Sequence, residues 1–231
     1  NKKLFEMNLF TEIQLQRAKK NKMNFTVKSI DTYECKDWLL NKHYAKRLCS
    51  ISFAFGLFDS DNILQGICTF GSPASRSLCI GVCGLENASK VYELNRFIIN
   101  KNEKNIASFF ISKCLKLLPK NLIIVSYSDT AQNHHGYIYQ ASNWIYTGST
   151  KERTDIGSED NTHSRHYDKN SDYSLNRKFR SSKHRYIYFT GSKTQKKILR
   201  NQLNYLEQPY PKGENKNYDA SYIPTIQTKL F

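Results

Sequence analysis

Apolar residues recur along the chain in short alternating runs separated by turn-forming residues, a pattern typical of strands in a half-buried sheet. Residues 51–58 alternate and are rich in aromatic side chains, and residues 63–70 form a second such run. The Asp-Ser-Asp-Asn between them is typical of a turn, so the two runs predict a hairpin. Four more runs predict further strands: residues 91–99, 122–127, 144–147 and 183–190.

Helical spacing of apolar residues is clearest between Ile106 and Leu118, where an amphipathic run ends at Pro119. Weaker helical patterns occupy residues 33–40, 137–144 and 194–205, whereas residues 76–90 predict an irregular insertion. This order predicts a mixed α/β fold whose central twisted sheet of about six strands is flanked by helices. No G-x-G-x-x-G follows a strand and no P-loop is present, which argues against a dinucleotide-binding fold.

Changes in polarity divide the chain into three predicted parts. Residues 1–30 are polar and basic and predict an arm or leading helix, residues 31–205 form the main domain, and residues 206–231 predict an extended tail. Within the domain, residues 151–182 are polar and aperiodic, and loops of this length are usually functional. No apolar run approaches the roughly 20 residues of a membrane span, and the start lacks signal-peptide features, so we expect a cytoplasmic protein without membrane contact.

Positive charge changes this picture by pointing to a partner. The formal net charge is +15, and residues 177–200 contain many Lys and Arg but no acid. Aromatic residues are interleaved with these cations, as in grooves that bind nucleic acid, although a charge run is more often a solvated face. The candidate DNA contacts are Arg47, Arg76, Arg153, His163, Arg165, His166, Arg180, Lys183 and Arg185.

The six cysteines do not form a metal or disulfide framework. Most lie inside apolar runs, as buried reduced thiols do, and Cys79 and Cys83 have no second pair at zinc-finger spacing. A structural zinc ion is therefore not expected.

Candidate chemistry concentrates where the strand at residues 122–127 ends. Asp129 follows it closely, and His134 and His135 come next, at the kind of strand end where α/β folds place active sites. The alternative is that Asp129 caps the following helix. A second candidate loop carries His43, Tyr44 and Arg47, for which a helix C-terminus is the alternative interpretation.

The element order resembles the GNAT acyltransferase superfamily. Residues 91–118 are similar to its strand-loop-helix that holds the acyl-CoA pyrophosphate, and residues 136–148 to its late helix and strand. One departure is Lys101–Ala107, which has no glycine where the superfamily has a glycine-rich loop. We expect a GNAT-like fold with a long basic insertion before the last strand, and a degenerate donor site that includes Arg96 and Ser108.

Within that superfamily the chain resembles the Mom family of phage DNA-modification proteins over about residues 43–191. The similar runs are HYAKRLCSISFAFGLF, CTFGSPASRSLCIG, VYELNRF, ASFFISKCLKLLPK, IIVSYSD, HHGYIYQASNWIYTG, TKERTDI, HSRHY and KHRYIYF. The resemblance implies a phage-encoded transferase that converts adenine in double-stranded DNA to its carbamoylmethyl derivative at the exocyclic amine. This modification protects phage DNA from host restriction, and iron has been associated with the family.

The exocyclic amine of adenine is a poor nucleophile, because the nitrogen lone pair is delocalised into the ring. We therefore expect Asp129 either to accept a proton from the amine or to hold the amine by a hydrogen bond. Ser108 is a candidate for binding an anionic donor or for covalent transfer, and Tyr139 for the general acid, with a core tyrosine as the alternative. The remaining candidates for proton relay or metal binding are His43, Tyr44, His134 and His135. If a metal is bound, we expect its ligands to be His43 or the His134–His135 pair.

Two other functions remain open from the sequence. A non-catalytic DNA-binding module on a GNAT-like scaffold would explain the missing glycines, and an acyl or aminoacyl transferase acting on RNA or protein would use the same scaffold. The donor, a small molecule or a carrier-bound group, is not identified by the sequence. Neither is the oligomeric state.

Overall fold

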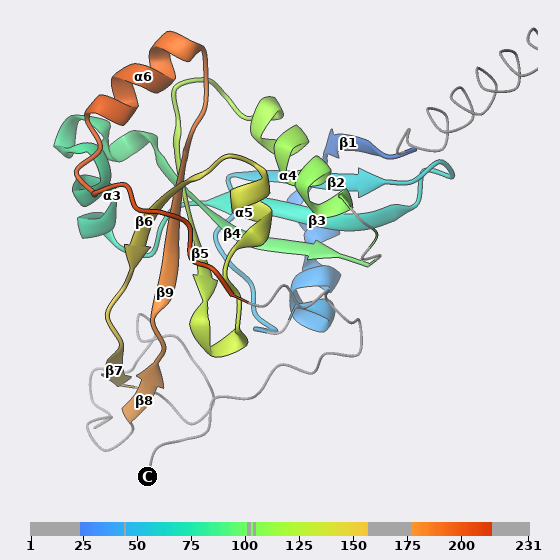
Figure 1. Cartoon of the computed structure of the whole chain (residues 1–231). Helices are drawn as coiled ribbons and strands as arrows, with labels where there is room; N and C mark the ends of the chain where they lie inside the picture. Colours follow the sequence, from blue (N-terminus) through green and yellow to red (C-terminus); the bar gives the residue numbers. More distant parts are fainter. Residues whose placement is uncertain (1–23, 44, 101–102, 104, 157–176, 214–231) are drawn as a thin grey trace, which may run out of the picture.

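A computed structural model describes residues 24–43, 45–100, 103, 105–156 and 177–213. Its main sheet has seven strands in the order β1-β2-β3-β4-β5-β9-β6, mostly antiparallel, with helices on both faces (Figure 1). The strands are β1 Thr26–Ser29, β2 Phe53–Phe58, β3 Leu64–Gly71, β4 Val91–Ile99, β5 Ile123–Asp129, β6 Ile145–Ser149 and β9 Lys183–Phe189. The predicted mixed α/β sheet flanked by helices is confirmed.

Three strands, β1, β7 and β8, lie where no strand pairing was predicted. Strand β1 falls within the segment predicted as a basic arm, and it pairs with β2 because its short alternating run supplies one more edge to the sheet. The predicted long loop contains β7 (Arg153–Ile156) and β8 (Arg177–Arg180), which pair as a separate two-stranded sheet. Figure 1 shows this β7–β8 hairpin beyond the ends of β6 and β9.

The helices are mostly short: η1 Thr32–Glu34, α2 Cys35–Asp37, η2 Trp38–Lys42, α3 Arg76–Cys83, η3 Leu85–Lys90, α4 Ile106–Leu117, η4 Thr130–Gln132, α5 Tyr137–Ala141 and α6 Lys193–Asn201. The prediction of an irregular insertion at 76–90 was wrong, because this segment forms α3 and η3. Ser75 caps α3 by accepting a hydrogen bond from the Leu78 amide, and Gly84, at φ 86°, ends it.

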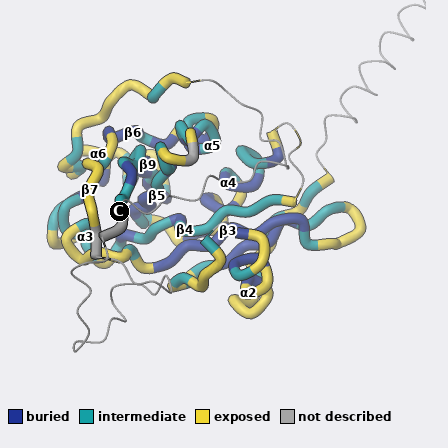
Figure 2. Tube along the Cα trace, turned by 90° about the horizontal axis from the view of Figure 1, so that it is seen from below, coloured by how far each residue is buried: buried dark blue, intermediate teal, exposed yellow. Residues whose placement is uncertain are grey.

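Both faces of the sheet bury hydrophobic clusters, since neighbouring strand residues point to opposite faces. A separate cluster joins Trp38 and Leu39 to Ala54 of β2 and Ile67 of β3. Helices α4 and α5 cover one face, where Phe110 packs in the same cluster as Leu94 and Ile124. Helices α3 and α6 cover the other face, with Ile123 and Val125. The buried positions follow the central strands in Figure 2. Within the described residues, no helix is long and apolar enough to cross a bilayer.

The sheet opens between its two central parallel strands. Strands β4 and β5 pair only from Val91 to Glu93 and from Ile123 to Val125, although they continue to Ile99 and Asp129. A register shift against β3 leaves Asn95 as a bulge in β4, and a bulge increases local bend and twist. The two strands then diverge (Figure 1). The end of β5 therefore lies beside an opening in the sheet, with β9 as its partner on the other side.

Candidate active site

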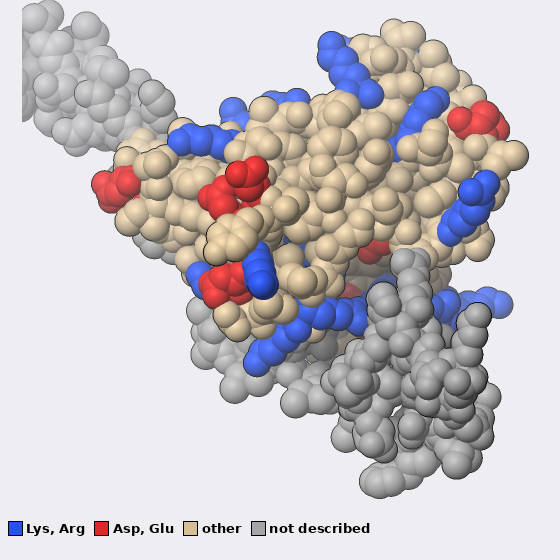
Figure 3. Space-filling view, turned by 180° about the vertical axis from the view of Figure 1, so that it is seen from behind, with Lys and Arg blue, Asp and Glu red and all other residues tan. Residues whose placement is uncertain are grey.

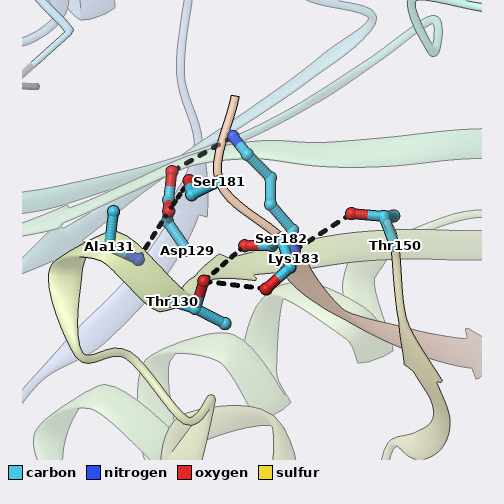
Figure 4. A network of polar contacts seen from close by, with 7 residues as sticks. All are labelled: Asp129, Thr130, Ala131, Thr150, Ser181, Ser182 and Lys183. Carbon is cyan, nitrogen blue, oxygen red and sulfur yellow. Dashed lines mark hydrogen bonds and ion pairs between the residues drawn. The ribbon is translucent and has the colours of Figure 1, made fainter. Parts of the chain in front are cut away.

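Asp129 is the last residue of β5, and its carboxylate contacts three other residues (Figure 4). Oδ1 accepts hydrogen bonds from the Ala131 amide, at 3.0 Å, and from the Ser181 hydroxyl. Oδ2 lies 3.3 Å from the Lys183 ammonium. The side chain is 12% exposed. Asp129 therefore caps η4, as the alternative interpretation of the sequence stated, and also forms an ion pair.

The charge of Lys183 acts on a second carboxylate besides Asp129, that of Glu93. The pKa of Glu93 is raised by burial, and the charges of Arg96 and Lys183 and a hydrogen bond from the Ala74 backbone partly offset this increase. Glu93 and Ser181 were not among the residues predicted for the site. The sequence did contain a signal for Glu93, because an acidic residue within an apolar strand is unusual. No local feature of the sequence distinguishes Ser181 as a site residue.

His43 and Arg96 belong to the same face of the sheet as Glu93. His43 is buried, and its Nδ1 accepts a hydrogen bond of 3.0 Å from the Ala45 amide. Burial, followed by the charges of Arg96 and Arg47, lowers the pKa of His43 to about 4. The ring is therefore neutral near pH 7, with its proton on Nε2. Arg96 donates from Nη1 to the Asn95 carbonyl, and its buried Nε has no hydrogen-bond partner among the described residues.

This arrangement predicts a specific effect of pH on stability. In the unfolded chain the pKa of His43 returns to about 6.5, so below that pH the unfolded state binds a proton that the folded state binds only near pH 4. The contribution of His43 to the free energy of unfolding is therefore highest above pH 6.5, and it falls by roughly 2–3 kcal/mol as the pH falls towards 4. His43→Asn keeps an acceptor for the Ala45 amide and should remove this loss, as urea unfolding from pH 7 to pH 4 can measure. Equal pH dependence in both proteins would contradict the assignment.

Tyr139 and Ser108 lie on the face opposite Asp129. Tyr139 is buried in α5 among Trp144 and Tyr186, as the core-tyrosine alternative stated. Its hydroxyl lies 2.8 Å from Ser126 Oγ, which also donates to the Leu94 carbonyl where β4 and β5 separate. Ser108 is near the start of α4, and its hydroxyl donates to the Asn105 carbonyl at 3.1 Å. The structure thus separates Ser108 from Arg96, its predicted partner in the donor site, by the thickness of the sheet.

His134 and His135 follow η4 and lie near Asp129. His43 does not belong to this group of side chains. Burial lowers the pKa of His134, and the charge of Asp129 opposes that effect. The ring centre of His135 is 5.8 Å from that of His184, and its Nδ1 is buried without a hydrogen-bond partner. Across the described residues, no group of three or more His, Cys, Asp or Glu side chains is placed to hold a metal ion. These residues therefore do not fit the predicted iron site.

The predicted DNA contacts divide into three groups. Arg153 and Arg180 are directly paired across the β7–β8 hairpin, and Arg47 and Arg76 are exposed elsewhere on the surface. Arg185 instead acts within the fold, because it donates two hydrogen bonds to Thr147 and lies 3.4 Å from the centre of the Tyr205 ring. The remaining predicted DNA contacts lie outside the described ranges: His163, Arg165 and His166. The catalytic candidate Tyr44 also lies outside them.

Charge on the surface is broadly distributed around a hollow. On the face in Figure 3, Lys and Arg side chains are spread widely, and several lie along its lower edge. That edge is hollowed, and acidic atoms are visible inside the hollow near the basic ones.

Solved structures that are similar to this chain are acetyltransferases. A ribosomal-protein-S5-alanine acetyltransferase from Vibrio fischeri matches 73% of this chain and 94% of its own, with 9% identity and a TM-score of 0.44. A spermidine N-acetyltransferase from Vibrio cholerae, in complex with CoA and spermine, matches 72% and 96%, with 12% identity and a TM-score of 0.43. A GNAT-family acetyltransferase from Bacillus cereus matches 73% and 99%, with 12% identity and a TM-score of 0.42. At these values the likeness carries no information about substrate or catalytic residues.

A sequence comparison, rather than the structural one, shows the family to which the chain belongs. The model of the Mom protein family matches residues 24–212, which is most of the chain. The chain therefore belongs to the Mom protein family, as its sequence predicted. No curated protein matches it.

Proposed function

We propose that this protein is a transferase that converts adenine in duplex DNA to its carbamoylmethyl derivative at the exocyclic amine. Membership of the Mom protein family supports this proposal. The observation that carries it is the position of Asp129, a mostly buried carboxylate at the open end of β5 and at the base of a basic hairpin. Binding DNA requires no such carboxylate, whereas deprotonating an amine does.

The proposed chemistry forms one bond and breaks another. The amine nitrogen of adenine bonds to the carbamoylmethyl carbon of the donor while the bond from that carbon to its leaving group breaks. The proton lost by the amine passes to the Asp129 carboxylate, and the leaving group departs with the bonding electron pair. Neutral His43 is limited to hydrogen bonding near pH 7, because its pKa of about 4 leaves it uncharged.

The proposed substrate is duplex DNA from which the target adenine is flipped out of the stack. The cations of the β7–β8 hairpin, Arg153 and Arg180, contact backbone phosphates, which position the duplex without reading its sequence. As in the family that the chain resembles, the modification protects phage DNA from restriction in the cytoplasm of the host.

The donor is expected to enter from the α4 and α5 face, where Ser108 and Tyr139 lie, with its reacting carbon in the opening between β4 and β5 beside the end of β5. That carbon is the methylene of the carbamoylmethyl group, which carries the leaving group, and the start of α4 is suited to an anionic part of the donor. Because the described side chains do not form a metal site, no step of the proposed reaction uses iron.

Nucleoside mass spectrometry of DNA from expressing cells tests this function directly. We expect a modified deoxyadenosine whose mass corresponds to an added carbamoylmethyl group in cells that express the parent protein, and none in cells without it. Unmodified DNA together with tight duplex binding would favour the non-catalytic module instead. Modified RNA or protein with unmodified DNA would favour a transferase of the other class.

A further inference from the structure

The base of the β7–β8 hairpin is joined to the end of β5 by a network of polar contacts (Figure 4). Here the hairpin base means Thr150, Ser181, Ser182 and Lys183. Thr150 precedes β7 and exchanges backbone and side-chain hydrogen bonds with Lys183, at 2.9 and 3.0 Å. Thr130 Oγ1 donates to the Ser182 carbonyl at 2.8 Å. The base therefore has a fixed position relative to β5 that does not depend on the hairpin tip.

Two residues of the hairpin base reach the Asp129 carboxylate itself. The Ser181 hydroxyl donates to Oδ1, which already accepts from the Ala131 amide. Lys183 is paired with Asp129 across β5 and β9, and its ammonium lies 3.3 Å from Oδ2. Two hydrogen bonds occupy Oδ1, so Oδ2 is the oxygen left to meet a substrate, with Lys183 beside it.

We propose that Ser181 and Lys183 are positioning residues that orient the Asp129 carboxylate, Ser181 by holding Oδ1 and Lys183 by holding Oδ2. This inference rests on the proposed function only in that Asp129 is the proton acceptor. It gives Lys183 a different role from the phosphate contact predicted from the basic run. Its ammonium forms an ion pair with the Asp129 carboxylate.

The charged groups around Asp129 come from two elements. Lys183 faces the carboxylate from β9, and His134 lies in the segment after η4. Lys183 is 41% exposed, so solvent screening keeps the ion pair itself weak, and the contribution of Lys183 is the orientation of Oδ2.

NMR of labelled Asp carboxyl carbons at pH 7 tests the contacts without any activity. Asp129→Asn identifies the Asp129 resonance by its loss. Ser181→Ala and Lys183→Met should each move the Asp129 resonance, because each removes a donor from one carboxylate oxygen, and Lys183→Arg should restore the parental position. Ser182→Ala should leave the resonance in place. An unchanged resonance in both Ser181→Ala and Lys183→Met would overturn the inference.

Single-turnover modification at saturating duplex DNA tests the consequence for catalysis. Ser181→Ala should slow the reaction about ten- to hundredfold, the usual value of a hydrogen bond to a charged group, while duplex affinity and thermal stability stay near parental. Ser182→Ala is the matched control, because its hydroxyl lies against Thr130 and does not touch Asp129. Lys183→Met should also slow the reaction at saturating DNA, and Lys183→Arg should restore the rate, because Arg can hold Oδ2 in the same way.

The outcomes separate this inference from the proposed function. If the parent protein does not modify DNA but the Asp129 resonance moves as expected, the function fails and the positioning contacts stand. If the parent modifies DNA and Ser181→Ala behaves like Ser182→Ala, the inference fails and the function stands. If Lys183→Met weakens duplex binding but reacts at the parental rate at saturating DNA, Lys183 is a phosphate contact instead.

Discussion

Asp129→Asn is expected to lower the rate of adenine modification about a hundred- to ten-thousand-fold while the protein remains folded and binds DNA. Loss of a general base has an effect of this size. The folded state should change little, because Asn still accepts from Ala131 and Ser181 and is nearly as good a helix cap as Asp. Only the ion pair to the partly exposed Lys183 is lost, which is worth about 0–1 kcal/mol.

One set of measurements on this variant separates catalysis from capping. Thermal unfolding, duplex affinity and the fraction of modified adenine are compared between the variant and the parent protein. Asp129→Ala serves as a second variant, since it removes the cap as well and should be less stable by about 1 kcal/mol. Modification at the parental rate by Asp129→Asn would make Asp129 a cap only and move the search for the proton acceptor to Glu93.

The double variant Arg153→Gln, Arg180→Gln is expected to weaken duplex binding about ten- to hundredfold at low salt. Each lost phosphate contact removes a charge-assisted hydrogen bond and reduces the slope of log affinity against log salt by about 0.9, so two contacts reduce it by about 1.8. The hairpin should remain paired, because the ladder from Arg153–Ile156 to Arg177–Arg180 is made by backbone groups that the substitutions keep. Fluorescence anisotropy with a labelled duplex at several salt concentrations measures both quantities.

A control of equal charge is available at the other end of the molecule. Lys193 and Lys197 are exposed on α6, which Figure 1 shows far from the β7–β8 hairpin. Lys193→Gln, Lys197→Gln removes the same net charge and should leave the salt slope closer to the parental value. Equal loss of affinity in the two double variants would assign DNA binding to overall charge and exclude the hairpin as a specific contact surface.

The sequence by itself determined the parts of the fold that depend on local pattern. Alternation over residues 51–58 and 63–70 marked the β2–β3 hairpin, because one face of each strand is buried. The apolar spacing before Pro119 marked α4, since proline lacks the amide that a helix interior needs. The same patterning failed for β1 and for β7 and β8, which are only four residues long and whose pairing partners lie far away in sequence.

The sequence also identified Asp129, because it directly follows an apolar strand, but only the tertiary structure decided what surrounds it. Ser181 and Lys183 reach the carboxylate through the pairing of β5 with β9, across more than fifty positions of chain, which no local pattern reports. Alternation in the sheet likewise separated Tyr139 and Ser108 from His43 and Arg96, although all had been predicted for one site. Side-chain direction in a strand changes with every residue, so membership of a site is fixed by register and packing rather than by residue type.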